Sequence, residues 1–281
     1  MDKQGFIDFN TRFSPENSGR ADSYAKALAI LERVLPYHPQ INLQGKSLYE
    51  INDTATIENI KRLVKEEVRK MKSHQPNIFD YGQPNQKSYP LGGFCSAALG
   101  SLVQYAEYDQ ELKQADDIVA HESNPKLIST KLIAHFDIEK DVEGEDIETI
   151  TKQRKGQDYF RRMILSNYAY RCALTGIDIP QLLLASHIIP WADKSHKKER
   201  LNPCNGICLS SLYDKAFDKG LMGFDSNYKV VLSQRLKGHC TESYYERYFG
   251  CVDRKELDLP NSEFKPDLTF LEYHMDTIFQ K

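Results

Sequence analysis

The sequence predicts an α+β fold in two parts: a mostly helical first half, and a second half that mixes short strands with helices. Three observations carry this prediction. Apolar residues recur at helical spacing through the first hundred residues, a run of acidic residues follows, and a later segment reads strand, loop, strand, helix. We therefore expect a helical domain at residues 1–130, an acidic linker at 131–150 and a second domain at 151–281.

The composition is that of a globular protein, with 40% hydrophobic and 27% charged residues among 281. No apolar stretch approaches the roughly 20 residues that a membrane span needs, so no membrane partner is expected. The first ten residues lack the apolar core of a secretory signal. Six cysteines in a chain of this length do not form a disulfide scaffold, and reduced thiols in a cytoplasmic protein are the simpler interpretation.

The charge balance limits the kind of nucleic-acid binding that the chain can support. It has 37 basic and 40 acidic residues, which gives a net charge of −3. This balance excludes a uniformly basic coat. Local basic sites are still compatible with it, because net charge averages over regions that differ.

Three amphipathic helices are predicted in the first hundred residues. The first covers 23–35 and ends where Pro36 cannot continue it. The second covers 56–72, with apolar residues at three- and four-residue steps and charged residues on the other face. A third covers 94–108, after a turn at Gly92-Gly93. From about Gln110 the apolar periodicity weakens.

The charge pattern changes sign near the middle of the chain. Seven acids repel one another and favour a solvated linker: Asp137, Glu139, Asp141, Glu143, Glu145, Asp146 and Glu148. Two basic groups follow, at 152–162 and at 194–200. Each group alone is typical of a solvated face. Because they flank one segment rich in candidate catalytic residues, together they favour a surface that tracks phosphates.

That segment, residues 170–233, predicts the order of its own elements. An apolar run forms a short strand that ends at His187, after which Pro190 and Trp191 turn the chain. A loop leads to Asn205-Gly206, a pair that favours a tight turn. A returning strand follows, then a helix that begins near Ser210 and ends at Gly220, and then a hairpin.

The predicted helix carries two acids at a spacing that suits a metal ion. Asp214 and Asp218 stand four residues apart, so their carboxylates share a face. Carboxylate oxygens can hold a hard cation such as Mg²⁺, whose other positions go to water and phosphate. A nearby imidazole could take a proton from an attacking water. These groups suffice for phosphodiester hydrolysis.

The same segment resembles the HNH endonuclease family, whose ββα-metal motif it matches in order. The likeness covers roughly residues 152–235, and the segment also resembles the subgroup found in bacterial restriction and defence nucleases. The matching positions are Cys172, Thr175-Gly176, His187-Ile188, Pro190-Trp191, Asn205-Gly206, Leu209, Phe217-Asp218 and Gly220.

The resemblance implies a role for each position. His187 matches the general base that activates water, and Asn205 matches the residue that braces the loop and orients that base. Asp214 stands where the family usually has its last His, and Ser186 where many members carry a metal-binding Asp. Asp218 is the candidate that completes the metal side, which implies one Mg²⁺ or Mn²⁺ per active site.

Double-stranded DNA is the substrate that the resemblance implies. Six residues are candidates to contact it: Arg161, Arg162, Lys197, Lys198, Arg200 and Tyr213. Packing in the core is the alternative for Tyr213, and fixing the loop is the alternative for Arg200. Double-strand cleavage by a one-metal nuclease commonly uses two active sites, so a homodimer is a further expectation.

Each residue also has a plainer interpretation. His187 taken alone would be a core or surface histidine, Asn205 a turn residue, and Asp214 a solvated helix residue. With Ser186 and Asp214 in place of the commoner Asp and His, the fold could have kept its shape without turnover, as a DNA-binding or interaction module. RNA as the substrate is not excluded. A structural zinc site is not expected, because the cysteines lack two paired clamps.

Overall fold

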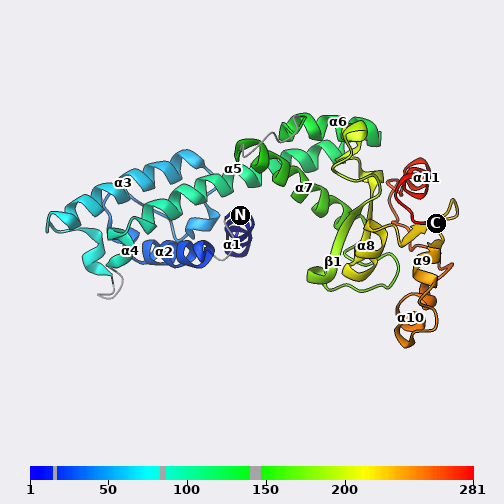
Figure 1. Ribbon diagram of the computed structural model, residues 1–281. Helices are drawn as coiled ribbons and strands as arrows, with labels where there is room; N and C mark the ends of the chain where they lie inside the picture. The colour runs from blue at the N-terminus through cyan, green and yellow to red at the C-terminus, as the bar shows by residue number, and fades with distance from the viewer. Residues whose placement is uncertain (15–17, 83–86, 140–146) are drawn as a thin grey trace. The chain divides into compact units, whose positions relative to one another are not determined.

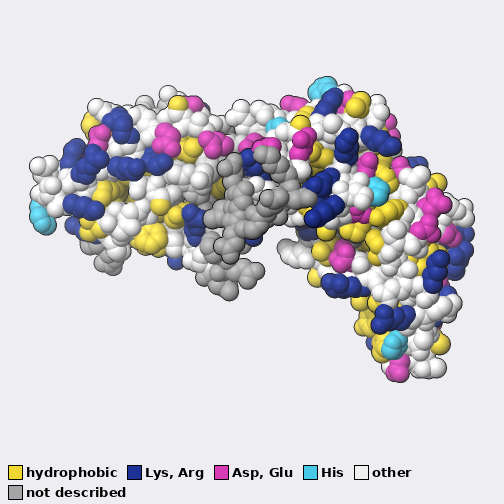
Figure 2. Space-filling model, turned by 45° about the horizontal axis from the view of Figure 1, so that its top comes forward, with side chains coloured by type: hydrophobic (Ala, Val, Ile, Leu, Met, Phe, Trp, Pro, Cys, Tyr) yellow, Lys and Arg dark blue, Asp and Glu magenta, His cyan; other side chains and the backbone are white. Residues whose placement is uncertain are grey.

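The chain divides into two compact units, Met1–Gln114 and Ala115–Lys281. The computed structural model describes residues 1–14, 18–82, 87–139 and 147–281 (Figure 1). No helix within these ranges is both long enough and apolar enough to cross a lipid bilayer. The visible face of both units carries Lys and Arg side chains interspersed with Asp and Glu (Figure 2).

The first unit is built from helices, and the predicted helices are confirmed. Leu28, Leu31 and Leu35 are fully buried, as are Ile57 and Val64. They face a common apolar core because three- and four-residue steps return to the same side of a helix. The elements are α1 Lys3–Arg12, α2 Arg20–Val34, η1 Leu35–Tyr37, η2 Leu48–Glu50, α3 Thr54–Lys72, η3 Ile78–Tyr81, α4 Ser88–Leu91 and α5 Phe94–Ala120.

Helix structure continues beyond the point at which the sequence pattern weakens. Helix α5 runs through the division between the units to Ala120, with Ala115 fully buried. Helix α6 (Pro125–Phe136) then begins at an Asn124 cap, and its first turn contains a proline, which is compatible with an N-terminal turn.

The division between the units therefore differs from the expected linker at 131–150. Residues 131–136 belong to α6, which buries Leu132, Ile133 and Phe136. These apolar side chains come before the acidic run, so the repulsion between the acids does not oppose the helix that they form. Five of the seven acids lie at positions whose structure or side chains fall outside the described residues: Asp141, Glu143, Glu145, Asp146 and Glu148.

The second unit contains the predicted strand, loop, strand and helix. Its elements after α6 are α7 Ile147–Asn167, η5 Pro180–Leu182, β1 Leu183–His187, η6 Lys194–Glu199, η7 Pro203–Asn205, β2 Gly206–Ser210, α8 Ser211–Asp218, β3 Met222–Phe224, β4 Val230–Leu232, α9 Gln234–Lys237, α10 Ser243–Tyr248, η8 Gly250–Val252 and α11 Leu268–Thr277. The mixture of helices with two small sheets confirms the α+β fold class.

Strands β1 and β2 form an antiparallel pair in which Ser186 lies opposite Ile207, and His187 opposite Gly206. Helices α7 and α8 both pack against this pair. The predicted hairpin is also present, as β3 paired with β4. This ββα arrangement places the candidate residues at the end of β1, at the start of β2 and along α8.

The tight turn expected at Asn205-Gly206 is absent. Asn205 ends the short helix η7, and Gly206 is extended, with φ −143°, as the first residue of β2. Glycine is required there for another reason. A Cβ atom at this position would lie 2.6 Å from the Ile164 side chain and 2.8 Å from the Phe160 ring, both on α7.

Candidate active site

Strand β1 presents consecutive side chains to different helices. Successive residues of a strand point to opposite faces of its sheet. On one face the His187 ring stacks on Phe160 of α7, with centroids 3.7 Å apart and 13° between the planes. On the other face the Ser186 hydroxyl donates to the Asp214 carboxylate of α8 at 2.7 Å. The site therefore has an aromatic side and an acidic side.

The His187 ring is held by a backbone carbonyl and by aromatic neighbours. Its Nε2 lies 3.0 Å from the carbonyl oxygen of Arg200, and its edge meets the Trp191 ring at a centroid distance of 5.6 Å. Because a carbonyl only accepts, Nε2 carries the proton of the neutral ring, and Nδ1 keeps the lone pair.

Burial sets the charge state of this ring. Loss of hydration lowers the pKa of His187 to about 4, the Arg200 guanidinium lowers it further, and the hydrogen bond to the Arg200 carbonyl partly opposes both. The ring is therefore neutral at neutral pH, with a lone pair on Nδ1. This is the protonation state that a general base needs.

Asn205 braces the loop between the two strands. The residue is buried, and its Oδ1 accepts from the Ile189 amide at 2.8 Å. Its Nδ2 donates to the carbonyl of Ile189 at 3.2 Å and to that of Glu199 at 2.9 Å. These three bonds join the start of the loop to its end. Asn205 thus acts on His187 through the backbone around it.

The acidic side offers oxygen ligands. Burial raises the pKa of Asp214, the negative charge of Asp218 adds to that rise, and the Ser186 hydroxyl opposes it. Asp214 is half-buried and Asp218 is exposed at the end of α8. A half-buried carboxylate that repels its neighbour gains from a cation beside it.

Asp214, Asp218 and Ser186 supply the kind of ligand that suits the divalent ion implied by the motif. Two carboxylates and a hydroxyl are hard donors, which suit Mg²⁺ or Mn²⁺ with water and phosphate in the other positions. Within the described ranges there is no cluster of three or more His, Cys, Asp or Glu side chains placed to hold a metal ion. The two carboxylates do not complete a coordination shell by themselves, so water and phosphate would have to supply the remaining ligands.

The structure does not bring His187 and Asp214 to one face. The ring lies against α7, whereas the carboxylate bonds to Ser186 on the side of α8. The expectation that both face a common ion therefore changes: a phosphodiester that contacts both must pass across the carboxyl end of β1. Strand alternation explains this placement, because residues 186 and 187 are consecutive.

At least four of the six candidate DNA contacts bond to other groups of the protein: Arg161, Arg162, Arg200 and Tyr213. The Arg161 guanidinium donates to the carbonyls of Leu183 and Pro180. The buried Arg200 donates from Nε to the Trp191 carbonyl and lies over the Trp191 ring. Such bonds fix the loop and the start of β1.

Tyr213 is also packed internally. It is buried, and its hydroxyl donates to the Tyr248 carbonyl at 2.8 Å. Of the other candidates, Arg162 is exposed and pairs with Asp116, Lys197 is partly exposed, and Lys198 is exposed. Arg162 and Lys198 are thus the exposed candidates, and Arg161 and Lys197 are partly exposed.

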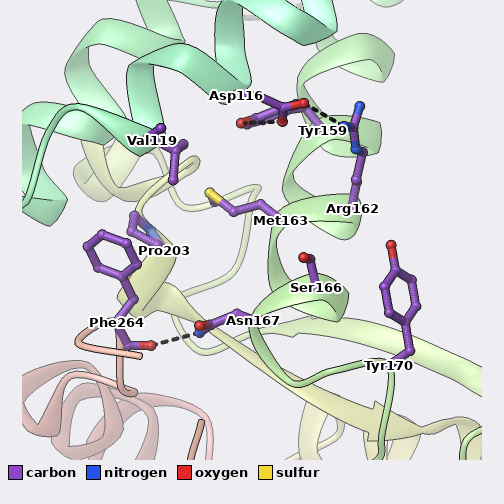
Figure 3. Close-up of a pocket in the computed structure, with 11 residues that line it drawn as sticks. Asp116, Val119, Tyr159, Arg162, Met163, Ser166, Asn167, Tyr170, Pro203 and Phe264 are labelled. Atoms are coloured by element: carbon purple, nitrogen blue, oxygen red, sulfur yellow. Dashed lines mark hydrogen bonds and ion pairs between the residues drawn. The ribbon is translucent and has the colours of Figure 1, made fainter. Parts of the chain in front are cut away.

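A cavity of about 480 Å³ lies on α7 away from these groups (Figure 3). Met163, Pro203 and Phe264 supply apolar walls, and Asp116, Arg162 and Asn167 are among the polar residues that line it. Asp116 pairs with Arg162, and Asn167 donates to the Phe264 carbonyl. His187, Asn205 and Asp214 do not line this cavity, so it is separate from the candidate site.

Sequence reasoning missed Phe160 as the support of the His187 ring. Because Phe160 follows Tyr159 within a basic stretch, the sequence pattern indicated only a DNA-binding surface at this position. It also missed Tyr273 and His274 of α11, which contact Asp193 and Phe217. The helical periodicity around Phe160 was the available signal. For the C-terminal pair there is no local signal, because their partners lie more than 50 residues away.

Comparison with known proteins agrees with this geometry. The family model described as HNH endonuclease matches residues 172–225, which include both strands, the loop between them and α8. Among curated proteins, no relative matches the chain. With its ββα arrangement and this match, the second unit contains a domain of the HNH endonuclease family.

Proposed function

We propose that the protein is a metal-dependent HNH endonuclease that hydrolyses phosphodiester bonds in DNA. The observation that carries the proposal is the state of His187 within the ββα arrangement. Its Nε2 bonds to the Arg200 carbonyl, and its burial keeps the ring neutral, which leaves Nδ1 unprotonated. A neutral, oriented imidazole at the end of the first strand is what a general base in this fold requires.

The proposed chemistry is a single displacement at phosphorus. Nδ1 of His187 takes a proton from water, the water oxygen forms a new bond to phosphorus, and the bond from phosphorus to the leaving sugar oxygen breaks. Asn205 keeps the loop and the Arg200 carbonyl in place, and thereby orients the ring. A bound divalent ion would neutralise charge on the phosphate and on the leaving oxygen.

Asp214 and Asp218 are the residues that would hold the ion, as Mg²⁺ or Mn²⁺. Ser186 keeps Asp214 oriented through its hydroxyl. The hard-donor set and the raised pKa of Asp214 support this assignment.

A second function is favoured by a specific observation. His187 and Asp214 lie on opposite faces of β1, and Nε2 of the ring is already engaged by the protein. If no phosphodiester can reach both groups, the domain binds DNA without cutting it. This catalytically inactive module is the alternative to the nuclease.

Plasmid nicking separates the two functions. Purified protein is incubated with supercoiled plasmid and Mg²⁺ or Mn²⁺, beside His187→Ala, Asp214→Asn and the control His121→Ala, an exposed histidine at the end of α5. We expect His187→Ala to lower the nicking rate about 10³-fold. Equal nicking by wild type and His187→Ala, or DNA binding with no nicking by either, would favour the inactive module. A single-stranded RNA substrate run in parallel tests the choice of nucleic acid.

The biological context is a further part of the proposal. The motif resembles bacterial restriction and defence nucleases, in which the first unit would recognise the target or a partner. A homodimer would provide two active sites for double-strand cleavage. Sedimentation of the protein with and without DNA measures that state. The cytoplasmic location expected from the sequence stays a prediction.

A further inference from the structure

Helix α11 lies outside the matched residues 172–225, yet it contacts the separate parts of the candidate site (Figure 1, red). The contact nearest its start is made by Asp267, which caps the helix. The Asp267 amide donates to the Cys204 carbonyl at 3.0 Å, directly beside Asn205. The helix therefore begins on the short element that carries the bracing residue.

The middle of α11 holds the loop that follows His187. The Tyr273 hydroxyl donates to the Asp193 carboxylate at 2.5 Å. The other carboxylate oxygen of Asp193 accepts from the Ser195 amide and lies 3.3 Å from Nδ1 of His196. Asp193 is thus fixed from both sides, in the loop whose Arg200 carbonyl orients the His187 ring.

The next residue holds α8. His274 is buried, and its ring stacks on Phe217 with centroids 3.8 Å apart and 3° between the planes. Its Nε2 donates to the Phe217 carbonyl at 3.1 Å, since a carbonyl only accepts. Phe217 lies on α8 between the two acids proposed to hold the metal.

The residues after α11 close the end of α8. The Gln280 amide donates to the Gly220 carbonyl at 2.8 Å, and its side chain donates to the Lys219 carbonyl at 2.8 Å. Gly220 has φ +65°, and a Cβ atom there would lie 2.1 Å from the Ile278 carbonyl oxygen. The last carbonyls of a helix have no partner within it, and here the C-terminal segment supplies the donors.

We propose that α11 is a positioning element of the HNH site: Tyr273 sets the loop that orients His187, and His274 sets the helix that carries Asp214 and Asp218. This inference rests on the proposed function, because it concerns how the same site is assembled. It assigns a role in the site to a helix that lies outside the matched residues 172–225. Neither residue touches the substrate; each acts through a partner.

The experiment separates the two roles by measuring Mn²⁺ binding by calorimetry, DNA binding by anisotropy and plasmid nicking. The variants are Tyr273→Phe, His274→Leu and His274→Gln, with Glu272→Gln as the control, an exposed residue on the same helix. His274→Gln keeps an N–H donor near the position of Nε2, whereas His274→Leu does not. Thermal unfolding is followed for each variant, and Gln280→Ala replaces His274→Leu if that protein does not fold.

We expect His274→Leu to weaken Mn²⁺ binding about tenfold and His274→Gln to restore most of it. Tyr273→Phe should lower the nicking rate about tenfold while leaving Mn²⁺ binding and DNA binding unchanged. Equal Mn²⁺ affinity in wild type, His274→Leu and Gln280→Ala, or unchanged nicking by Tyr273→Phe, would overturn the inference. A wild-type protein that binds Mn²⁺ without cutting DNA overturns the proposed function, and Mn²⁺ binding by the His274 variants then still decides the role of α11. One that binds no Mn²⁺ overturns both.

Discussion

On the α7 side of strand β1, the His187 ring contacts the Phe160 and Trp191 rings and is neutral. On the α8 side, one residue earlier, Ser186 bonds to the Asp214 carboxylate, which the Asp218 carboxylate repels. The first environment disfavours charge and the second attracts a cation. A step of one residue along one strand is therefore enough to separate a neutral imidazole from an acidic side. The predictions below test whether the two sides are independent.

The largest effect is expected at Asn205, which bonds to both ends of the loop between β1 and β2. Asn205→Ala removes three hydrogen bonds and leaves the backbone groups of Ile189 and Glu199 without this partner. We expect the free energy of unfolding to fall by about 3 kcal/mol, with loss of nicking. Urea unfolding measures it, and Asn261→Ala, at an exposed position, is the control. A stable but inactive Asn205→Ala protein would show instead that Asn205 acts directly in chemistry.

The aromatic side is tested by Phe160→Leu. This change hydrates the His187 ring, so the pKa of His187 should rise from about 4 toward its ordinary 6.5. A base works only when unprotonated, so activity is lost as the pH falls through this pKa. The acid limb of the pH–rate profile should therefore move to higher pH.

The matched control for that change is Phe136→Leu, a buried aromatic on α6 that does not contact His187. It should lower stability to a similar extent without moving the acid limb. NMR titration of His187 measures the pKa directly. An acid limb that stays in place in Phe160→Leu would mean that the stack does not control the charge state of the ring.

The smallest effect is expected on the acidic side. Ser186→Ala removes the hydrogen bond that lowers the pKa of Asp214, so this pKa should rise further. Protons then compete better with a cation, and Mn²⁺ affinity should fall about threefold, more at pH 5 than at pH 7. Ser129→Ala, a buried serine that bonds to the Lys198 carbonyl, is the control. A change in the pH profile of His187 in Ser186→Ala would show that the two sides are coupled.

Much of the fold could be predicted from local pattern. The apolar steps of α2 and α3 and the order of β1, β2 and α8 follow from spacing and capping alone. The continuation of α5 and the existence of α6 did not follow, because tertiary burial of Ala115 and Phe136 stabilises helices whose own periodicity is weak.

The candidate site divides in the same way. The motif indicated His187, Asn205 and Asp214, and their roles stay a prediction. Strand alternation predicts that residues 186 and 187 lie on opposite faces of the sheet. The expectation that His187 and Asp214 face a common metal ion did not include this alternation. The contacts of Tyr273 and His274 could not be predicted, since they join segments that only the tertiary fold brings together.

Arg200 has a consequence for how mutants of this protein are interpreted. Its guanidinium is buried against Trp191, while its main-chain oxygen holds the imidazole of His187. Replacing Arg200 would therefore shift that oxygen and slow cleavage even if the side chain never meets a phosphate. An alanine scan that measured only turnover would therefore misread the buried Arg200 side chain as a contact with the nucleic acid. DNA affinity measured at several salt concentrations distinguishes the two roles, because only the loss of a phosphate contact changes the salt dependence of binding.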